Sequence, residues 1–254
     1  MWPYSKSSPF VDILSANKTA RQINFIKKII TTYFYNKKII IIDAGCGTGR
    51  LTIPLCRLSQ VKEIIGFDKS VKMLEIAQKK AAECKSMKIK FIKGDLTKPL
   101  LLPKADLVIC MYTTFNYLTK DSDIISGLKN IKNYLKGTGL ALIDLSNLFY
   151  YSFISQPNKP IIKIYKRGSL LIKEVITVEY QISKNIWLHK MKLMVKNKSN
   201  QKYTVIKELH KLRYISITEM KYFAKEAGLN IEKIFFDYNF KNLNGHRLIF
   251  LLKK

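Results

Sequence analysis

The sequence predicts an α/β fold around a parallel sheet, into which a second, antiparallel sheet is inserted. Between residues 38 and 148, short apolar segments alternate with amphipathic helical segments. Such alternation predicts parallel strands joined by right-handed helical crossovers, with helices on both faces of the sheet. Residues 150–214 instead alternate apolar and polar side chains at period two, which is typical of an antiparallel meander with one solvated face. The α/β pattern then resumes, so the meander interrupts a single α/β domain.

The individual elements follow in a regular order. A helical segment comes first, within residues 1–37, because apolar residues from Ile23 to Tyr33 recur at a period near 3.6. We then expect strands at 39–43, 61–68, 89–93, 105–111 and 140–145, and helices at 50–58, 71–84 and 122–135. A helix at 218–227 and two strands at 231–238 and 247–252 close the chain. The predicted division is an α/β domain over 1–149 and 215–254, with N-terminal helices at 1–37, and a β insertion over 150–214.

The chain carries a large positive charge. Its 254 residues contain 45 Lys and Arg against 18 Asp and Glu, a formal net charge of +27. Such a charge is typical of proteins that bind nucleic acid or anionic membranes. However, only six of the 45 are Arg, whereas phosphate and base recognition favours Arg over Lys. We interpret the charge mainly as background composition, so nucleic acid is a partner that stays open without being favoured.

Cysteines and histidines give no sign of a disulfide framework or a metal site. Cys46, Cys56, Cys84 and Cys110 are scattered without a CxxC pair, and the three histidines lie far apart. The longest apolar runs are far shorter than the roughly 20 residues that span a bilayer. The first residues do not resemble a signal peptide. We therefore expect a cytoplasmic protein without bound metal and without a membrane partner, and we leave a homodimer open.

The strongest local signal is a glycine-rich turn after the first strand. Asp43 is followed by Gly45, Gly47 and Gly49, and the next helix is expected to begin directly afterwards. Glycines let a ligand lie against the backbone, and a helix start offers unpaired N–H donors. The dinucleotide-binding fingerprint is the rival interpretation, but it needs a third glycine where Arg50 stands. A glycine turn that serves packing alone is the other alternative.

Two further carboxylates stand at the ends of later strands. Asp68 ends the second strand, where an ionised carboxylate can accept hydrogen bonds from both hydroxyls of a ribose. The alternative for Asp68 is to cap the next helix, a role that Ser70 could also fill. Asp95 follows the third strand and could accept from an exocyclic amine, although a turn role is the simpler interpretation.

Taken in order, these motifs resemble those of class I S-adenosylmethionine-dependent methyltransferases. They are the glycine turn, Asp68, the segment 94–96 and the strand 105–111, and the resemblance covers about residues 15–148 and 217–252. It implies a Rossmann-like, seven-stranded sheet whose last strand is antiparallel, with S-adenosyl-L-methionine as cofactor and S-adenosyl-L-homocysteine as product. The cofactor contacts that it implies come from Arg21, Asp43, Gly45, Cys46, Gly47, Gly49, Asp68, Lys69, Met73, Asp95, Leu96, Cys110 and Met111.

Two features make the sequence similar to glycine N-methyltransferase and to amino-sugar N-methyltransferases. One is the inserted meander, which in those enzymes covers the substrate pocket. The other is Arg21, which matches the arginine that holds the cofactor carboxylate there; an exposed helix charge is the alternative for this residue. The stretch Met111–Tyr117 lacks the Asn-Pro-Pro-Tyr motif of base and glutamine amide methyltransferases, which argues against methylation of DNA bases.

The acceptor determines which side chains are needed. Methyl transfer depends mainly on positioning, and a neutral amine needs no strong base. A hydroxyl acceptor would need one, for which a histidine would be expected. The catalytic candidates are Tyr112, His189 and Tyr214, and the substrate-binding candidates are Tyr112, Phe115, Asn116 and His189. Each could instead be a packed aromatic, a helix cap or a buried structural histidine.

We therefore expect a methyltransferase that acts on a small molecule, with an amine nitrogen as the favoured acceptor. The alternatives are an RNA or protein methyltransferase that uses the lysine-rich surface, and a non-catalytic S-adenosylmethionine-binding protein. Lysines gather on the meander, where their charge could steer an anionic substrate or be solvated background: Lys190, Lys192, Lys196, Lys198 and Lys202.

Overall fold

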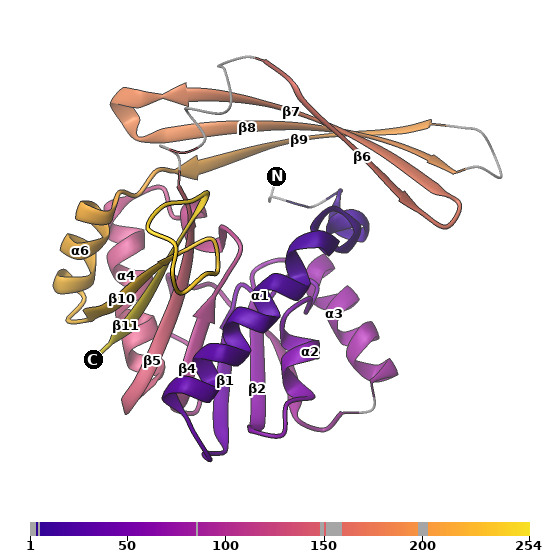
Figure 1. The fold of residues 1–254 in the computed structure, drawn as a ribbon. Coiled ribbons are helices and arrows are strands. Elements are labelled where there is room, and N and C mark those ends of the chain that lie inside the picture. Colours follow the sequence, from indigo (N-terminus) through magenta and orange to yellow (C-terminus); the bar gives the residue numbers. More distant parts are fainter. Residues whose placement is uncertain (1–3, 5, 85, 148–149, 151–158, 198–202) are drawn as a thin grey trace.

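The computed structural model describes residues 4, 6–84, 86–147, 150, 159–197 and 203–254, and it contains two β-sheets (Figure 1). The strands of the larger sheet are β1 (Ile39–Ala44), β2 (Val61–Asp68), β3 (Ile89–Lys93), β4 (Ala105–Cys110), β5 (Leu135–Ser146), β10 (Asn230–Phe236) and β11 (Arg247–Lys253). Those of the smaller sheet are β6 (Ile161–Arg167), β7 (Leu170–Gln181), β8 (Ile186–Asn197) and β9 (Tyr203–Arg213).

The larger sheet has the strand order β10-β11-β5-β4-β1-β2-β3. Its central pairs are parallel, whereas β11 pairs antiparallel with both β5 and β10. The smaller sheet is antiparallel throughout, in the order β6-β7-β8-β9. These pairings confirm the predicted fold class, a seven-stranded α/β sheet with an antiparallel last strand and an additional antiparallel meander. The predicted division into two domains stays a prediction.

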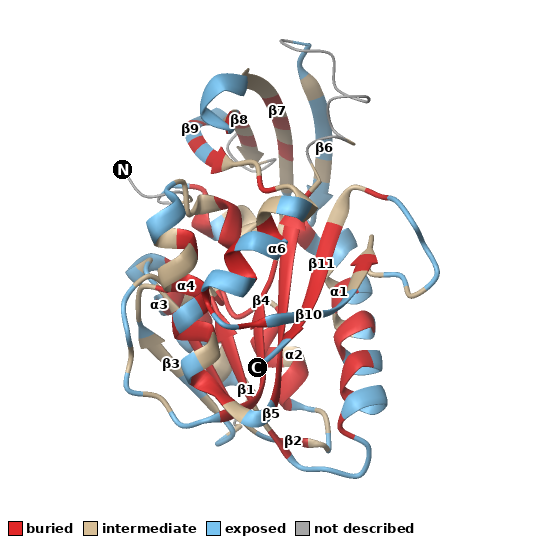
Figure 2. Cartoon of the chain, turned by 90° about the vertical axis from the view of Figure 1, so that its left-hand side faces the viewer, coloured by how far each residue is buried: buried red, intermediate tan, exposed pale blue. Residues whose placement is uncertain are grey.

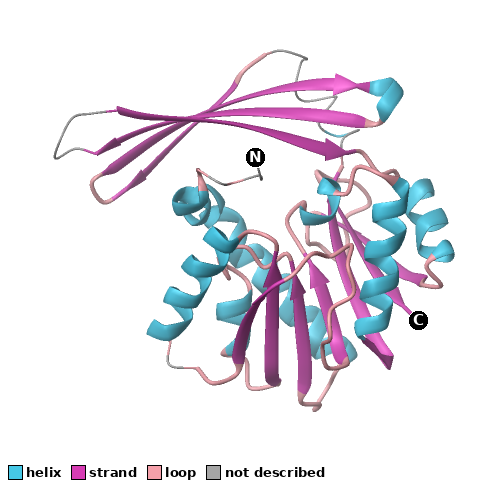
Figure 3. Ribbon diagram, turned by 180° about the vertical axis from the view of Figure 1, so that it is seen from behind, coloured by secondary structure: helices cyan, strands magenta, loops and turns pink. Residues whose placement is uncertain are grey.

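Helices cover both faces of the seven-stranded sheet. The helices of the α/β part are η1 (Ser8–Phe10), α1 (Val11–Tyr33), α2 (Thr52–Cys56), α3 (Val71–Glu83), η2 (Thr114–Tyr117), α4 (Asp121–Tyr134) and α6 (Ile217–Glu226), whereas η3 (Ile182–Lys184) joins β7 and β8 of the smaller sheet. Apolar side chains of α1 and α2 pack on one face, and those of α4 and α6 pack on the other (Figures 1 and 3). The buried residues therefore concentrate on the sheet between the two helical layers (Figure 2).

The helix expected at 50–58 is shorter in the structure. It begins at Thr52, because Gly49 has a φ of +70° and the glycine turn continues through Leu51. The other strands and helices of the α/β part begin and end close to the expected positions; the largest difference is β5, which starts at Leu135 rather than residue 140. Among the described residues, no helix is long and apolar enough to cross a membrane.

The four-stranded sheet lies over the carboxyl ends of β1, β2 and β4 (Figures 1 and 3). Along β8, Trp187 and Met191 are buried while Lys190 and Lys192 are exposed, which is the expected period-two alternation. The buried face of the sheet packs against Phe10, Ile13 and Leu14 at the start of α1, and those side chains form a small core with Met191 and Leu193 among others. The turn expected at 183–185 is present as η3, whereas Lys198, Lys202 and the second expected turn lie outside the described residues.

Two polar side chains tie this sheet to the rest of the molecule. Glu208 of β9 accepts hydrogen bonds from the backbone N–H of Lys6 (2.8 Å) and from the backbone N–H (3.0 Å) and hydroxyl (2.7 Å) of Ser7. Asn116 is fully buried; its amide nitrogen donates to the Arg213 carbonyl (2.9 Å), and its amide oxygen accepts from the Ser146 N–H (3.1 Å). The segment before α1 and the loop after β4 therefore hold the smaller sheet in place.

Candidate cofactor cleft and acceptor cavity

A cleft of about 540 Å³ opens where β1, β2 and β4 end. Eleven of the residues predicted from the sequence line it: Asp43, Gly45, Cys46, Gly47, Asp68, Lys69, Met73, Asp95, Leu96, Met111 and Tyr112. The parallel strands bring these residues together, because the carboxyl ends of β1, β2, β3 and β4 meet at one edge of the sheet. The structure thus gathers most of the predicted cofactor residues at one site.

The glycine turn has the backbone conformation that glycine allows. Gly45 and Gly47 have φ values of +76° and +54°, in the left-handed region. A Cβ at Gly45 would overlap the side chain of Thr114, whereas a Cβ at Gly47 would meet no atom within 4 Å. Gly45 is therefore needed for packing as well as for backbone conformation, while Gly47 leaves open space beside the cleft that it lines.

Asp43 is a buried carboxylate at the base of the turn. Its side chain accepts a hydrogen bond from the Thr52 hydroxyl at 2.6 Å. Burial raises the pKa of Asp43 to about 6, although the Thr52 hydrogen bond and the Arg50 charge oppose the rise. Asp43 thus joins the start of α2 to β1, and its charge depends on pH in the range just below neutrality.

Asp68 and Asp95 are two of the carboxylates that line the cleft. The Asp68 carboxylate accepts from the Gly47 N–H (2.9 Å) and the Ser70 N–H (2.8 Å), so it orders the glycine turn. Ser70, rather than Asp68, caps α3, by accepting from the Met73 N–H. Asp95 makes the turn contacts expected of it, with the Thr97 N–H (3.0 Å) and hydroxyl (2.8 Å), and it also forms an ion pair with Lys69 (2.6 Å).

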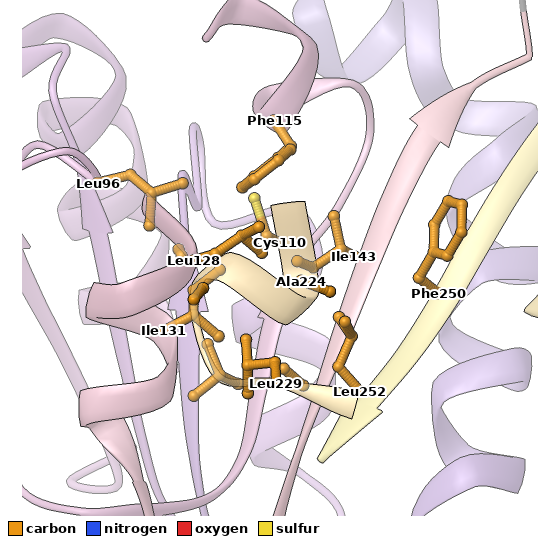
Figure 4. Packing of buried hydrophobic residues seen from close by; sticks show 14 of the residues in the cluster. Leu96, Cys110, Phe115, Leu128, Ile131, Ile143, Ala224, Leu229, Phe250 and Leu252 are labelled. Carbon is orange, nitrogen blue, oxygen red and sulfur yellow. The ribbon is translucent and has the colours of Figure 1, made fainter. Parts of the chain in front are cut away.

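Three predicted residues belong to the packed interior rather than to the cleft. Cys110 and Phe115 lie in the same core cluster as the apolar residues of α4 (Figure 4), and neither lines the cleft. Gly49 is also buried, and a Cβ there would stand 2.8 Å from the Phe91 ring. Apolar side chains at the end of a central strand alternate between the helical layer and the cleft, and Cys110 falls on the helical side while Met111 faces the cleft.

Arg21 does not reach the cleft, and Arg50 does. Arg21 is exposed on α1, on a face turned away from the sheet, so its alternative interpretation as a surface charge fits the structure. Arg50 lines the cleft directly after the glycine turn. Its guanidinium donates to Thr19 (2.8 Å) and Gln22 (2.6 Å) of α1, which fixes its position. Sequence analysis named Arg50 only as the residue at the third glycine position of the dinucleotide fingerprint and gave it no role in binding.

A second cavity, of about 130 Å³, lies between the cleft and the four-stranded sheet. Tyr112 and His189, both predicted from the sequence, line it. Burial, together with His210 and two nearby lysines, lowers the pKa of His189 to about 3, so this imidazole is neutral at pH 7. Tyr214 packs instead against Trp187 and Leu212, outside both cavities, and Asn116 is used in the structural contacts described above. Neither side chain lines the cleft or the second cavity.

Tyr112 stands between the two cavities, on strained backbone. Tyr112 and Thr113 have φ values of +58° and +72°, which non-glycine residues rarely adopt. The Asp144 carboxylate accepts from the Tyr112 N–H (2.9 Å) and pairs with the Arg247 guanidinium (2.8 Å). Burial raises the pKa of the Tyr112 phenol, but the Lys18 and Arg50 charges outweigh burial, so the net effect is a lowered pKa. The loop conformation is thus held by Asp144, a residue that sequence reasoning missed although it stands alone among apolar residues in its strand.

The described residues contain no group of three or more His, Cys, Asp or Glu side chains that could hold a metal ion. What they present is a glycine turn at the carboxyl edge of a seven-stranded sheet with an antiparallel last strand, two acidic strand ends and a covered cavity. This combination defines a class I methyltransferase architecture.

Comparison with known proteins agrees. Residues 41–139 match the methyltransferase domain family. A protein of Geobacillus sp. (strain WCH70), named as a methyltransferase, is 26% identical over 239 residues, which are 91% of each chain. The crystal structure of an S-adenosylmethionine-dependent methyltransferase from Clostridium acetobutylicum superposes with a TM-score of 0.81 over 98% of each chain, at 21% identity. That of a sugar N-methyltransferase from Streptoalloteichus superposes with a TM-score of 0.75 at 12% identity, over 94% of this chain and 89% of that one. Residues 41–139 thus form a methyltransferase domain, and the chain as a whole has the fold of S-adenosylmethionine-dependent methyltransferases.

Proposed function

We propose that the enzyme transfers a methyl group from S-adenosylmethionine to an amine nitrogen of a small molecule, which binds in the cavity beneath the four-stranded sheet. The observation that carries this proposal is that the two cavities share a wall. Tyr4, Val11, Tyr112 and Tyr117 line both the cofactor cleft and the smaller cavity. Ligands in the two cavities would therefore lie next to each other, as a direct transfer between them requires.

The charges in the cleft fit S-adenosylmethionine. Asp68 and Asp95 lie toward one side, where they can accept hydrogen bonds from the ribose hydroxyls and the adenine amine. Arg50 is a fixed cation in the same cleft, and we assign to it the cofactor carboxylate that the sequence resemblance gave to Arg21. The open space beside Gly47 leaves room for a ligand against the backbone.

The chain's contribution to the reaction is positioning and exclusion of water. When bound, the cofactor supplies an activated methyl group on a sulfonium. The chain holds the acceptor in a covered cavity and orients the wall residue Tyr112 through Asp144. His189, with its lowered pKa, is too weak a base to activate a hydroxyl at pH 7. A neutral amine needs no such base, and this supports an amine acceptor over an alcohol.

The likeness to a sugar N-methyltransferase supports the same choice, because both chains carry the fold over most of their length. The cover over the acceptor cavity also supports a small molecule rather than a nucleic acid duplex, which could not enter beneath the sheet.

The test begins with binding of S-adenosylhomocysteine, measured by calorimetry. Asp68→Asn is expected to lower the affinity at least tenfold, since a hydrogen bond to a charged group contributes about 1.5–3 kcal/mol. Glu63→Gln on the same strand, which removes only a surface ion pair with Lys90, is the matched control. The wild-type enzyme is then incubated with S-adenosylmethionine and pools of small amines, alcohols or RNA, and products are identified by mass spectrometry. Methylated alcohols or RNA, with the amines unchanged, would contradict the proposal.

A further inference from the structure

The smaller cavity beneath the four-stranded sheet, here called the acceptor cavity, is lined by a buried carboxylate that the proposed reaction has not used. This carboxylate belongs to Glu174 on β7, which is only 6% exposed. It lines the cavity, on the inner face of the four-stranded sheet, together with apolar side chains from all four strands: Ile161, Ile176, Val178, Met191 and Leu212. A carboxylate in such surroundings is costly unless a cation or several donors compensate its charge.

Glu174 has little compensation within the chain. The Tyr165 hydroxyl donates to its carboxylate at 2.8 Å. Among the residues that the structure describes, it forms no ion pair within 4.0 Å, even though Lys163 stands opposite it in the strand register. Arg247, another of the cations that line the cavity, is paired with Asp144.

Glu208, the other acid of this sheet with a buried side chain, has its charge compensated in a different way. Glu208 accepts three hydrogen bonds from the backbone and side chain of residues 6 and 7, and it lies 3.6 Å from His210. Its charge is thus satisfied by the protein. Within the described part of the chain, Glu174 has a single neutral donor, and it lines the cavity.

We propose that Glu174 is the substrate-binding residue that receives the acceptor's ammonium group. This inference rests on the proposed function and adds the residue that selects a cationic amine. The proton that the ammonium must lose before its lone pair can attack passes to the Glu174 carboxylate, which leaves a neutral amine and a neutral carboxyl group. Lys18 and Lys163 also line the cavity and contribute to the lowered pKa of His189, but both are exposed, so solvent screens their charges more than that of the buried carboxylate.

The probes are chosen by size and charge. A cavity of about 150 Å³ in another protein binds benzene, and this one, at about 130 Å³, opens toward the cleft. Benzylamine, which is protonated at pH 7, and benzyl alcohol, its neutral counterpart, have nearly the same size and shape, so they differ as probes mainly in charge. Their dissociation constants are measured by calorimetry on the full chain with S-adenosylhomocysteine at saturation. We expect benzylamine to bind at least tenfold more tightly than benzyl alcohol.

Three variants separate ligand binding from structure. Glu174→Gln keeps an oxygen that can accept from Tyr165 but loses the charge, and it should abolish the preference for benzylamine. Tyr165→Phe breaks the same hydrogen bond but keeps the carboxylate, and it should retain the preference. Glu179→Gln, on the exposed face of β7 where Glu179 pairs with Lys190 at 2.7 Å, removes an equal charge outside the cavity and should change nothing.

The outcomes are distinguishable. Failure of S-adenosylhomocysteine to bind the wild-type chain would refute the proposed function itself. If it binds but benzylamine has no advantage over benzyl alcohol, or if the advantage persists in Glu174→Gln, the role of Glu174 is refuted while the methyltransferase assignment stands. Equal loss of the preference in Glu174→Gln and Tyr165→Phe would also refute it, because the hydrogen bond rather than the charge would then be the cause.

Discussion

Replacing either of two glycines in the same turn by alanine should affect folding and binding differently: one variant mainly loses stability, and the other mainly loses cofactor binding. Gly45 and Gly47 both have positive φ values, so each substitution costs about 1–2 kcal/mol of backbone strain. At Gly45 the new methyl would also overlap Thr114, and overpacking adds about 1–3 kcal/mol. At Gly47 it meets nothing within 4 Å. Gly45→Ala should therefore lower the free energy of unfolding by about 2–5 kcal/mol, and Gly47→Ala by only about 1–2 kcal/mol.

Urea denaturation measures the first effect and S-adenosylhomocysteine calorimetry the second. Gly47→Ala should fold yet bind poorly, because its methyl occupies space beside the cleft. Thr114→Ser removes the methyl that Gly45→Ala would strike and keeps the hydroxyl that donates to the Met111 carbonyl at 2.9 Å. The double variant should recover part of the stability that Gly45→Ala loses. Equal destabilisation by the two alanines, or a double variant no more stable than Gly45→Ala, would refute the steric argument.

Three further predictions concern charge. Burial raises the pKa of Asp43 from 3.8 to about 6, so between these pH values the folded state binds a proton that the unfolded state does not. The free energy of unfolding should therefore fall by up to about 3 kcal/mol as pH rises from 4 to 6. Asp43→Asn should flatten this part of a denaturation-versus-pH curve, and an unchanged slope would contradict the raised pKa of Asp43. Arg50→Gln should weaken S-adenosylhomocysteine binding in calorimetry, whereas Arg21→Gln should not, and the reverse order would restore the role that sequence resemblance gave to Arg21. His189→Gln should slow methyl transfer by much less than the roughly 100-fold that loss of a general base costs. The pH–rate profile of the variant between pH 5 and 8 should match that of the wild type. If the variant loses an inflection that the wild type shows, His189 does act as a base.

The sequence was most informative where local pattern and structure coincide. The apolar strands, the glycine turn and the carboxylates at strand ends follow from short-range spacing, and parallel topology then places Asp43, Asp68 and Asp95 at one edge. Helix periodicity also predicted α1, but it could not tell which polar residues on that helix face the cleft. Arg21 and Gln22 are neighbours in the chain, yet Gln22 is buried against Arg50 while Arg21 is exposed.

Long-range contacts were the part that sequence could not supply. Asp144 and Arg247 are 103 residues apart and meet because β5 and β11 pair antiparallel. Asn116 looks like a loop residue in the sequence, but both polar groups of its side-chain amide are hydrogen-bonded to the backbone of distant strands, at Arg213 and Ser146. Glu174 alternates with apolar residues in a strand and has no motif around it, so only the cavity reveals that its carboxylate is enclosed.

The wall that the cleft and the acceptor cavity share has a thermodynamic consequence. Tyr4, Val11, Tyr112 and Tyr117 border both spaces, so a ligand that shifts one of these side chains changes the room left for the other ligand. Any such coupling must be reciprocal: the factor by which cofactor changes acceptor affinity equals the factor by which acceptor changes cofactor affinity. Methyl transfer removes the positive charge of the cofactor's sulfonium and enlarges the acceptor in the same step, so each product leaves its site while the neighbouring site holds a changed ligand.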